Sequence, residues 1–285
     1  MTTTRPTPSL VIGHWSLVIS AAALFGAVAF PSSVQAQRYI LKDNTSLAAA
    51  DVTLGSGALV QEVAITGGGS FERRFPLGDI ARLDFPEPEA LDEAEKLVVA
   101  GSGAEALKLI QPVYRQFAPF AKIAGSHWPR AAQLRLQALL LGTDKSTITS
   151  AARELMQSGL GPEVTGIAKL ALAQLDARDG RESLAKVMLD EIVREAPPSI
   201  QARAWLLRGD LAAARAAHAE ALECYLRIPA FFGTIDELMP AALLGAARAY
   251  KGYGDNDRAE RAALDLIDTY SSTLQAAQAK KEFNL

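Results

Sequence analysis

A spacing that recurs along the last two thirds of the chain constrains its fold more than any other feature. A glycine or alanine that suits a turn is followed five residues later by a small residue, and successive turn positions lie 41, 38, 36 and 38 residues apart. The pairs are Gly101/Ala106, Gly142/Thr147, Gly180/Ala185, Ala216/Ala221 and Gly254/Ala259. Glycine permits a positive-φ turn, and a small side chain lets two helices approach closely. The spacing therefore predicts five helical hairpins.

The hydrophobic pattern supports helices over the same region. From Glu89 to about Lys281 apolar residues recur with a period of 3.6, which is typical of amphipathic helices. The clearest unit is Pro240–Tyr270, two amphipathic segments separated by Gly254. Pro112 falls inside the second helix of the first unit, where we expect a kink. A longer connection, residues 117–128, follows it.

These hairpins resemble the tetratricopeptide repeat (TPR) family. Matches to TPR positions occur at Trp205, Gly209, Ala221 and Tyr225, and again at Gly180, Ala185 and Pro197. The resemblance implies a mainly α protein, an α-solenoid of about five degenerate TPR-like hairpins over residues 87–285. It also implies that the first helix of each hairpin lines a groove that binds proteins.

Residues 37–86 have a different sequence pattern, typical of short β-strands and turns. Five short β-type runs are expected at 38–41, 51–54, 59–65, 70–75 and 80–85. The glycine-containing stretches 55–57 and 67–69 between them are turn signals. The pattern predicts a small β domain, either an SH3- or Sm-like barrel or a meander. Because its core is small, we expect it to be stabilised by packing against the helices.

The first 36 residues read as a secretory signal peptide. Arg5 precedes an apolar run, Leu17–Phe30, and Val34-Gln35-Ala36 forms a cleavage site. The alternative is an uncleaved membrane anchor, because Leu10–Phe30 approaches the ~20 apolar residues that span a bilayer. We expect an exported protein of the periplasm or cell envelope.

Charge and motifs exclude several classes of function. The formal net charge of −3 argues against a general nucleic-acid binder. A single cysteine, Cys224, allows no intrachain disulfide and reads as a small buried residue. Gly101-Ser102-Gly103 begins a G-x-G-x-x-A match, but the sequence before it is helical and no acid occurs between Glu105 and Asp144, so a nucleotide site is not predicted. No catalytic, metal or cofactor motif is found, and we predict neither an enzyme nor a cofactor.

Two binding surfaces are predicted. The TPR register places six polar residues in the groove: Gln174, Arg178, Arg203, Asp210, Arg248 and Lys251. Their net charge is positive, so an acidic or carboxylate-bearing peptide is the expected ligand. The second surface is a basic and aromatic patch in a stretch, residues 106–143, that contains no acid: Lys108, Arg115, Lys122, Trp128, Arg130 and Arg135. The alternative for this stretch is a solvated basic face with aromatic side chains that fill irregular hairpins.

The leader, the β domain ending in Pro76–Pro88 and the degenerate repeats together resemble a family of exported TPR proteins from Verrucomicrobia-like bacteria for which no activity is known. The predicted function is a non-catalytic, protein-binding scaffold or adaptor. One alternative is a structural envelope protein that forms homo-oligomers through its β domain. A third is a periplasmic enzyme whose catalytic residues come from distant parts of the chain.

Overall fold

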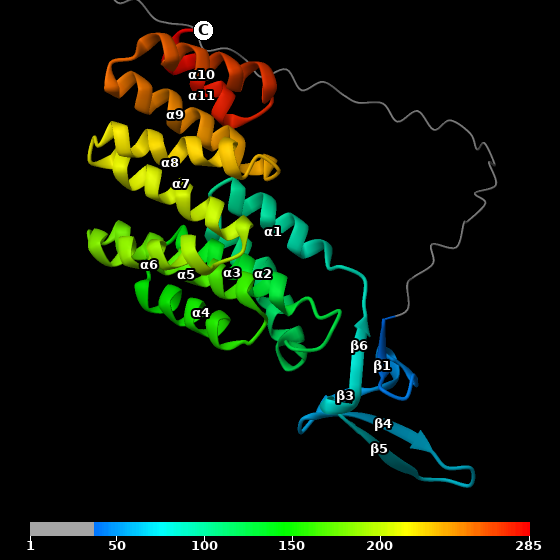
Figure 1. Ribbon diagram of the computed structural model, residues 1–285. Coiled ribbons are helices and arrows are strands. Elements are labelled where there is room, and N and C mark those ends of the chain that lie inside the picture. Colours follow the sequence, from blue (N-terminus) through cyan, green and yellow to red (C-terminus); the bar gives the residue numbers. More distant parts are fainter. Residues whose placement is uncertain (1–36) are drawn as a thin grey trace, which may run out of the picture. The chain divides into compact units, whose positions relative to one another are not determined.

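The computed structural model describes residues 37–285, which lie within one compact unit that spans residues 35–285. The predicted leader, residues 1–36, lies outside the described residues. The described chain begins with six short strands and continues with eleven α-helices (Figure 1). The sequence therefore predicted the fold class correctly at this level: mainly helical, with a small β region first.

The strands pair as two three-stranded antiparallel sheets. One has the order β2-β1-β6 and the other β3-β4-β5. Their bounds are β1 Arg38–Leu41, β2 Ser46–Ala48, β3 Thr53–Gly55, β4 Ala58–Ala64, β5 Ser70–Pro76 and β6 Ile80–Asp84. In β5, Phe75 is the one buried side chain, so much of this hairpin faces solvent.

Five of the six strands were predicted. The missed strand, β2, has only three residues and pairs with β1, with Tyr39 opposite Leu47. Strands β3, β4 and β5 follow one another as a meander. Hydrogen bonding among the described strands gives two separate sheets, with no pairing that joins them into a closed barrel.

Most of the helices follow one another with short connections. Their bounds are α1 Glu89–Val99, α2 Gly103–Phe117, α3 Trp128–Leu140, α4 Lys145–Gln157, α5 Pro162–Arg178, α6 Glu182–Glu195, α7 Pro198–Ala214, α8 His218–Phe231, α9 Met239–Tyr253, α10 Asn256–Thr269 and α11 Leu274–Phe283. Two short 3₁₀ turns interrupt the series, η3 Ala118–Phe120 and η4 Asp236–Leu238. Helix α2 continues through Pro112, and η3 lies in the long connection that the sequence predicted before α3.

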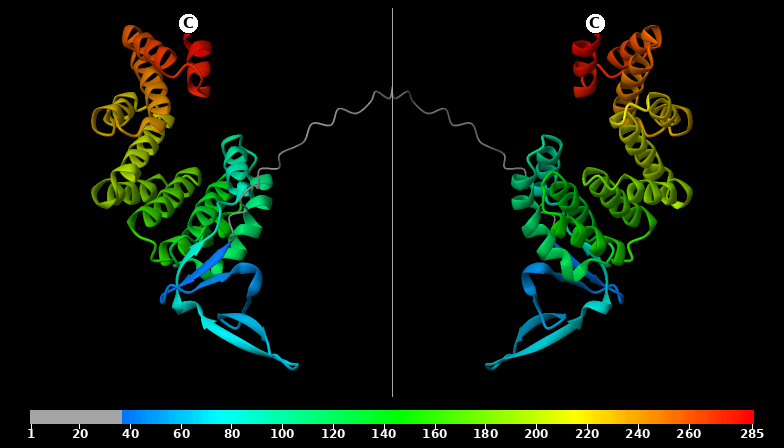
Figure 2. Two further views of the ribbon diagram at one scale, coloured as in Figure 1. Left: turned by 90° about the vertical axis from the view of Figure 1, so that its right-hand side faces the viewer. Right: turned by 90° about the vertical axis from the view of Figure 1, so that its left-hand side faces the viewer.

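Each helix packs against the next, and the odd-numbered helices α1, α3, α5, α7, α9 and α11 also contact one another in sequence. Figure 2 shows the same succession, as the colours change from green to red along the helices. A helix can contact its second neighbour only where that neighbour is on the same side. The odd-numbered helices therefore supply a continuous series of adjacent faces.

The predicted turns explain where the helices end. Gly101, Gly180, Ala216 and Gly254 all have positive φ, between +60° and +92°, and each stands just before the next helix. The four alanines five residues after these turns, at positions 106, 185, 221 and 259, are at most 1% exposed. Gly142 is outside the positive-φ set, and the Asp144 carboxylate caps α4 instead by accepting from the amides of Ser146 and Thr147. This is the unit in which the sequence pattern was weakest.

Tyr225 shows how closely the later helices pack. Its side chain in α8 is 3% exposed, and it lies between Gly209 of α7 and Gly245 of α9. A β-carbon at either glycine would come within 2.6 Å of the phenol ring. Glycine is required at both positions because three helices converge on one aromatic ring.

The β region shares its core with the first helices. Leu59, Phe75 and Leu83 belong to the same buried cluster as Leu91 of α1 and Ile110 of α2. The amide of Leu83 in β6 also donates to the carbonyl of Ala124 in the α2–α3 connection, at 2.8 Å. The prediction that the small sheets lean on the helices is therefore confirmed.

Candidate functional site

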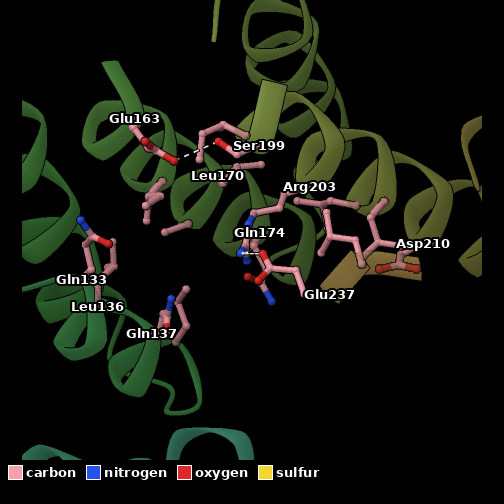
Figure 3. A pocket seen from close by; sticks show the side chains of 17 residues that line it. Gln133, Leu136, Gln137, Glu163, Leu170, Gln174, Ser199, Arg203, Asp210 and Glu237 are labelled. Carbon is pink, nitrogen blue, oxygen red and sulfur yellow. Dashed lines mark hydrogen bonds and ion pairs between the residues drawn. The ribbon is translucent and has the colours of Figure 1, made fainter. Parts of the chain in front are cut away.

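A pocket of about 490 Å³ opens between three odd-numbered helices (Figure 3). Helices α3, α5 and α7 supply nearly all of its lining, and η4 supplies the rest. Half-buried apolar side chains of Ile167, Leu170, Leu206 and Leu207 form its floor. An apolar floor favours burial of a ligand's own apolar side chains.

Polar residues stand around this floor. Gln133 and Gln137 lie one turn apart on α3, and Gln174 comes from α5. Figure 3 shows the α3 glutamines on the side of the pocket opposite Asp210. Each side-chain amide carries both a donor and an acceptor, so these groups can pair with a peptide backbone.

The charges of the lining are mainly negative. Three carboxylates, Glu163, Asp210 and Glu237, face one guanidinium, that of Arg203. Arg203 forms a salt bridge with Glu237. Glu163 accepts a hydrogen bond from the Ser199 hydroxyl at 2.9 Å, which leaves its charge uncompensated.

Asp210 is an exposed residue whose carboxylate is held in place by a hydrogen bond from a buried side chain. The hydroxyl of buried Tyr225 donates to its Oδ1 at 2.8 Å. Surrounding protein raises the pKa of the Asp210 carboxyl by desolvation, although this bond and Arg248 act in the opposite direction. Burial of the ring and, to a lesser degree, the same carboxylate raise the pKa of Tyr225, so its hydroxyl stays protonated as a donor.

Three of the six predicted groove residues line the pocket: Gln174, Arg203 and Asp210. The other three contact their own chain. Arg178 donates to the carbonyl oxygens of Leu140 and Gly142, at 2.8 and 2.7 Å, where α3 ends. The pocket lining is therefore mainly negative, whereas the sequence predicted a positive groove.

Arg248 and Lys251 contact the C-terminal helix. Arg248 Nε donates to Glu282 at 2.8 Å, and Lys251 donates to the backbone carbonyl of the same residue at 3.1 Å. The Lys251 ammonium also lies 5.0 Å from the centre of the Phe283 ring. Helix α11 thus pairs the charge of Arg248 and contacts Lys251, two of the cations that the sequence assigned to a ligand.

The predicted basic and aromatic patch is altered by acids from other helices. Arg130 forms salt bridges with Glu87, Asp92 and Glu95, and the last two belong to α1. The segment 106–143 has no acid of its own, but folding brings these carboxylates onto it. Arg130 is therefore already paired within the chain.

The rest of the patch is divided between the surface and the interior. Trp128 is 4% exposed and packs against Tyr114, whose ring Arg135 covers at 4.9 Å. Arg135 also lies 3.7 Å from Glu154. Lys108, Arg115 and Lys122 are exposed. The aromatic part of the patch thus serves packing, as the alternative interpretation predicted.

Other chemically interesting residues have structural surroundings. His127 Nε2 lies 3.2 Å from the carbonyl oxygen of Phe85, and burial raises the pKa of the Cys224 thiol. A β-carbon at Gly103 would lie 2.5 Å from the Ala138 carbonyl oxygen, so this glycine serves the contact between α2 and α3. Among residues 37–285, no group of three or more His, Cys, Asp or Glu side chains is arranged to hold a metal ion.

Sequence reasoning missed part of the pocket. Gln133, Gln137, Glu163 and Glu237 line it but were not predicted. The glutamines on α3 are four residues apart, a spacing that places both on one face of a helix. This signal was present, but α3 belongs to the region where the repeat register is irregular. Glu237 lies in η4, outside any repeat position.

No protein-family model matches this chain, and comparisons with curated proteins and with solved structures found no match. Within residues 37–285, no helix has both the length and the apolar character needed to cross a bilayer.

Proposed function

We propose that the helices form an α-solenoid of five degenerate TPR-like hairpins capped by α11, and that its groove binds an extended segment of a partner protein. The protein would act as a non-catalytic scaffold or adaptor. No cofactor takes part in this function.

The observation that carries the proposal is the origin of the pocket lining. Helices α3, α5 and α7 are the first helices of three consecutive hairpins, and all three contribute to one pocket. In TPR-like arrays, which bind partners through the groove, these are the helices that line it. The order of helix contacts supports the same arrangement.

A preformed groove of this kind favours binding for two reasons. Its side chains project from helices that are already packed, so little conformational entropy is lost on binding. Leu170 and Leu207 can each cover an apolar side chain of the ligand, and full burial of such a side chain contributes about 1.5–3 kcal/mol. The polar rim then selects among ligands.

Site-specific photo-cross-linking tests the groove in living cells. A photoreactive residue replaces Gln174 in the pocket or, as the control, Val187 on α6, which is 68% exposed and outside the pocket. We expect a discrete adduct from position 174 that is absent from position 187. Adducts from position 187 alone would contradict the proposed groove.

Export to the periplasm or cell envelope is also part of the proposal and is supported by the leader pattern of residues 1–36. Cell fractionation and the mass of the mature protein test this point. A chain that begins at Gln37 is expected. A full-length chain in the membrane fraction would favour the uncleaved anchor instead.

A second candidate function, self-assembly, is favoured by the β4–β5 hairpin. Its apolar residues Ile65 and Phe71 are 50% and 51% exposed, and β5 is an edge strand. Edge strands offer unpaired backbone groups to another chain. Sedimentation velocity distinguishes this function: oligomers that dissociate in Phe71→Lys would support it, and a monomer at all concentrations would exclude it.

A further inference from the structure

The length and chemistry of the pocket specify its ligand more narrowly than the proposed function does. Along α7, its lining runs from Ser199 in the first turn to Asp210 near the end of the helix. Eleven residues of α-helix rise about 16 Å at 1.5 Å per residue. An extended peptide advances about 3.3 Å per residue, so about five residues of ligand fit along this helix.

A carboxylate stands at each end of this span. Glu163 lies beside Ser199, to which it is hydrogen-bonded, and Asp210 is eleven residues further along α7. The partners of both carboxylates in these bonds are neutral hydroxyl groups, Ser199 and Tyr225. Arg248 also acts on the Asp210 carboxylate but is itself paired with Glu282, so each end of the pocket offers a carboxylate to a ligand.

The middle of the pocket offers different chemistry. Leu170 and Leu207 provide an apolar surface, and Gln137 and Gln174 provide amide donors and acceptors. The one cation of the lining, Arg203, lies between the two ends and is paired with Glu237. A ligand carboxylate would have to displace Glu237 to reach it.

We propose that the pocket binds an extended peptide segment with a lysine or arginine at each end of about five residues and apolar side chains between them. This inference rests on the proposed function of the groove. It reverses the expectation of an acidic ligand, because the predicted cations Arg178, Arg248 and Lys251 are bonded to the chain's own carbonyl and carboxylate groups. The basic ends pair with Glu163 and Asp210, and the glutamines pair with the peptide backbone.

Selection from a phage-displayed library of random twelve-residue peptides on the immobilised full-length chain tests this inference. We expect enrichment of sequences with two basic residues about five positions apart and apolar residues between them. The affinity of an enriched peptide, labelled with fluorescein, is then measured by fluorescence anisotropy.

Three variants identify the contacts of that peptide. Glu163→Gln and Asp210→Asn should each weaken binding about two- to fivefold, the range expected for a solvent-accessible ion pair. Glu260→Gln is the matched control, because this exposed carboxylate lies on α10, outside the pocket. It should leave the affinity unchanged.

A neutral blocking variant separates failure of the inference from failure of the proposed function. Gln174→Trp fills the pocket from an exposed position and adds no charge. If enriched peptides are acidic or uncharged and Gln174→Trp abolishes their binding, peptide binding in the groove is supported and the proposal of a basic ligand is wrong. If no peptide is enriched, or Gln174→Trp leaves binding intact, both the proposed binding groove and the inference of a basic ligand are wrong.

Discussion

The packing of Tyr225 between two glycines gives a quantitative test of the helix arrangement. A β-carbon at Gly209 would lie 2.5, 2.7 and 2.9 Å from three ring carbons of Tyr225. Carbon atoms in favourable contact are about 3.5–4.0 Å apart, so the ring would have to move by about 1 Å. Because Gly245 brings α9 equally close to the same ring, the ring has no free side to move toward.

The magnitude follows from two opposing effects. Overpacking of a core costs about 1–3 kcal/mol, whereas alanine is favoured over glycine in a helix by about 1 kcal/mol. Because Gly245 confines the ring, we expect an overpacking cost of about 2–3 kcal/mol, so Gly209→Ala should lower the free energy of unfolding by about 1–2 kcal/mol. Urea denaturation followed by circular dichroism measures this difference.

A double-mutant cycle tests the physical cause. When Tyr225→Ala has removed the ring, Gly209→Ala should no longer destabilise and should instead gain up to about 1 kcal/mol from helix propensity. Gly252→Ala is the matched control within α9, because its β-carbon would meet the end of the half-buried His218 ring, which can rotate away. A Gly209→Ala variant that is as stable as the wild type, or equally destabilised without the ring, would refute the packing argument.

Three further predictions concern single residues. Ala216 has φ +60°, a conformation that costs a non-glycine residue about 1–2 kcal/mol. Ala216→Gly removes this cost, but glycine loses more conformational entropy on folding, so the free energy of unfolding should rise by a net amount of about 0.5–1 kcal/mol. Urea denaturation measures this difference. The raised pKa of Asp210 means that ionisation of this carboxyl lowers the free energy of unfolding, so Asp210→Asn should be more stable than the wild type at pH 7. The difference should vanish below about pH 3.9, where the carboxyl is protonated in both the folded and the unfolded chain. The hydrogen bond from Arg248 lowers the pKa of Glu282, so this pair stabilises α11 above about pH 4.3 and is lost as the pH falls through the folded-state pKa. Glu282→Gln should therefore increase tryptic cleavage at Lys280 at neutral pH, and equal cleavage of both chains would contradict this.

Local sequence was sufficient to predict the helix pairs. A positive-φ turn depends on the residue that occupies it, so Gly101, Gly180 and Gly254 could be found without knowledge of distant contacts. The β strands were predictable for the same reason, except for β2. That strand is only three residues long, and its pairing with β1 supplies the evidence that its own sequence lacks.

Charge was the property that sequence reasoning could not assign to a surface. Arg130 lies in a segment without acids, yet carboxylates 35 to 43 residues earlier in the chain pair with it. Arg248 is likewise paired with Glu282, 34 residues later. Such pairs depend on which helices become neighbours. The repeat register did place Gln174, Arg203 and Asp210 at one pocket, because register determines the face of a helix, whereas the partner of a charge depends on the whole fold.

Tyr225 connects the packing of the helices with the proposed ligand site. Its ring is fixed by Gly209 and Gly245, and its hydroxyl fixes Asp210 at one end of the pocket. Tyr225→Phe removes the donor but keeps the ring, so it should cost about 1 kcal/mol of stability or less while leaving the Asp210 carboxylate free to turn. If Asp210 binds a basic side chain in a fixed geometry, Tyr225→Phe should weaken an enriched basic peptide about as much as Asp210→Asn does in fluorescence anisotropy. Unchanged affinity would mean that the position of this carboxylate does not matter for binding, and that the packing of Tyr225 serves stability alone.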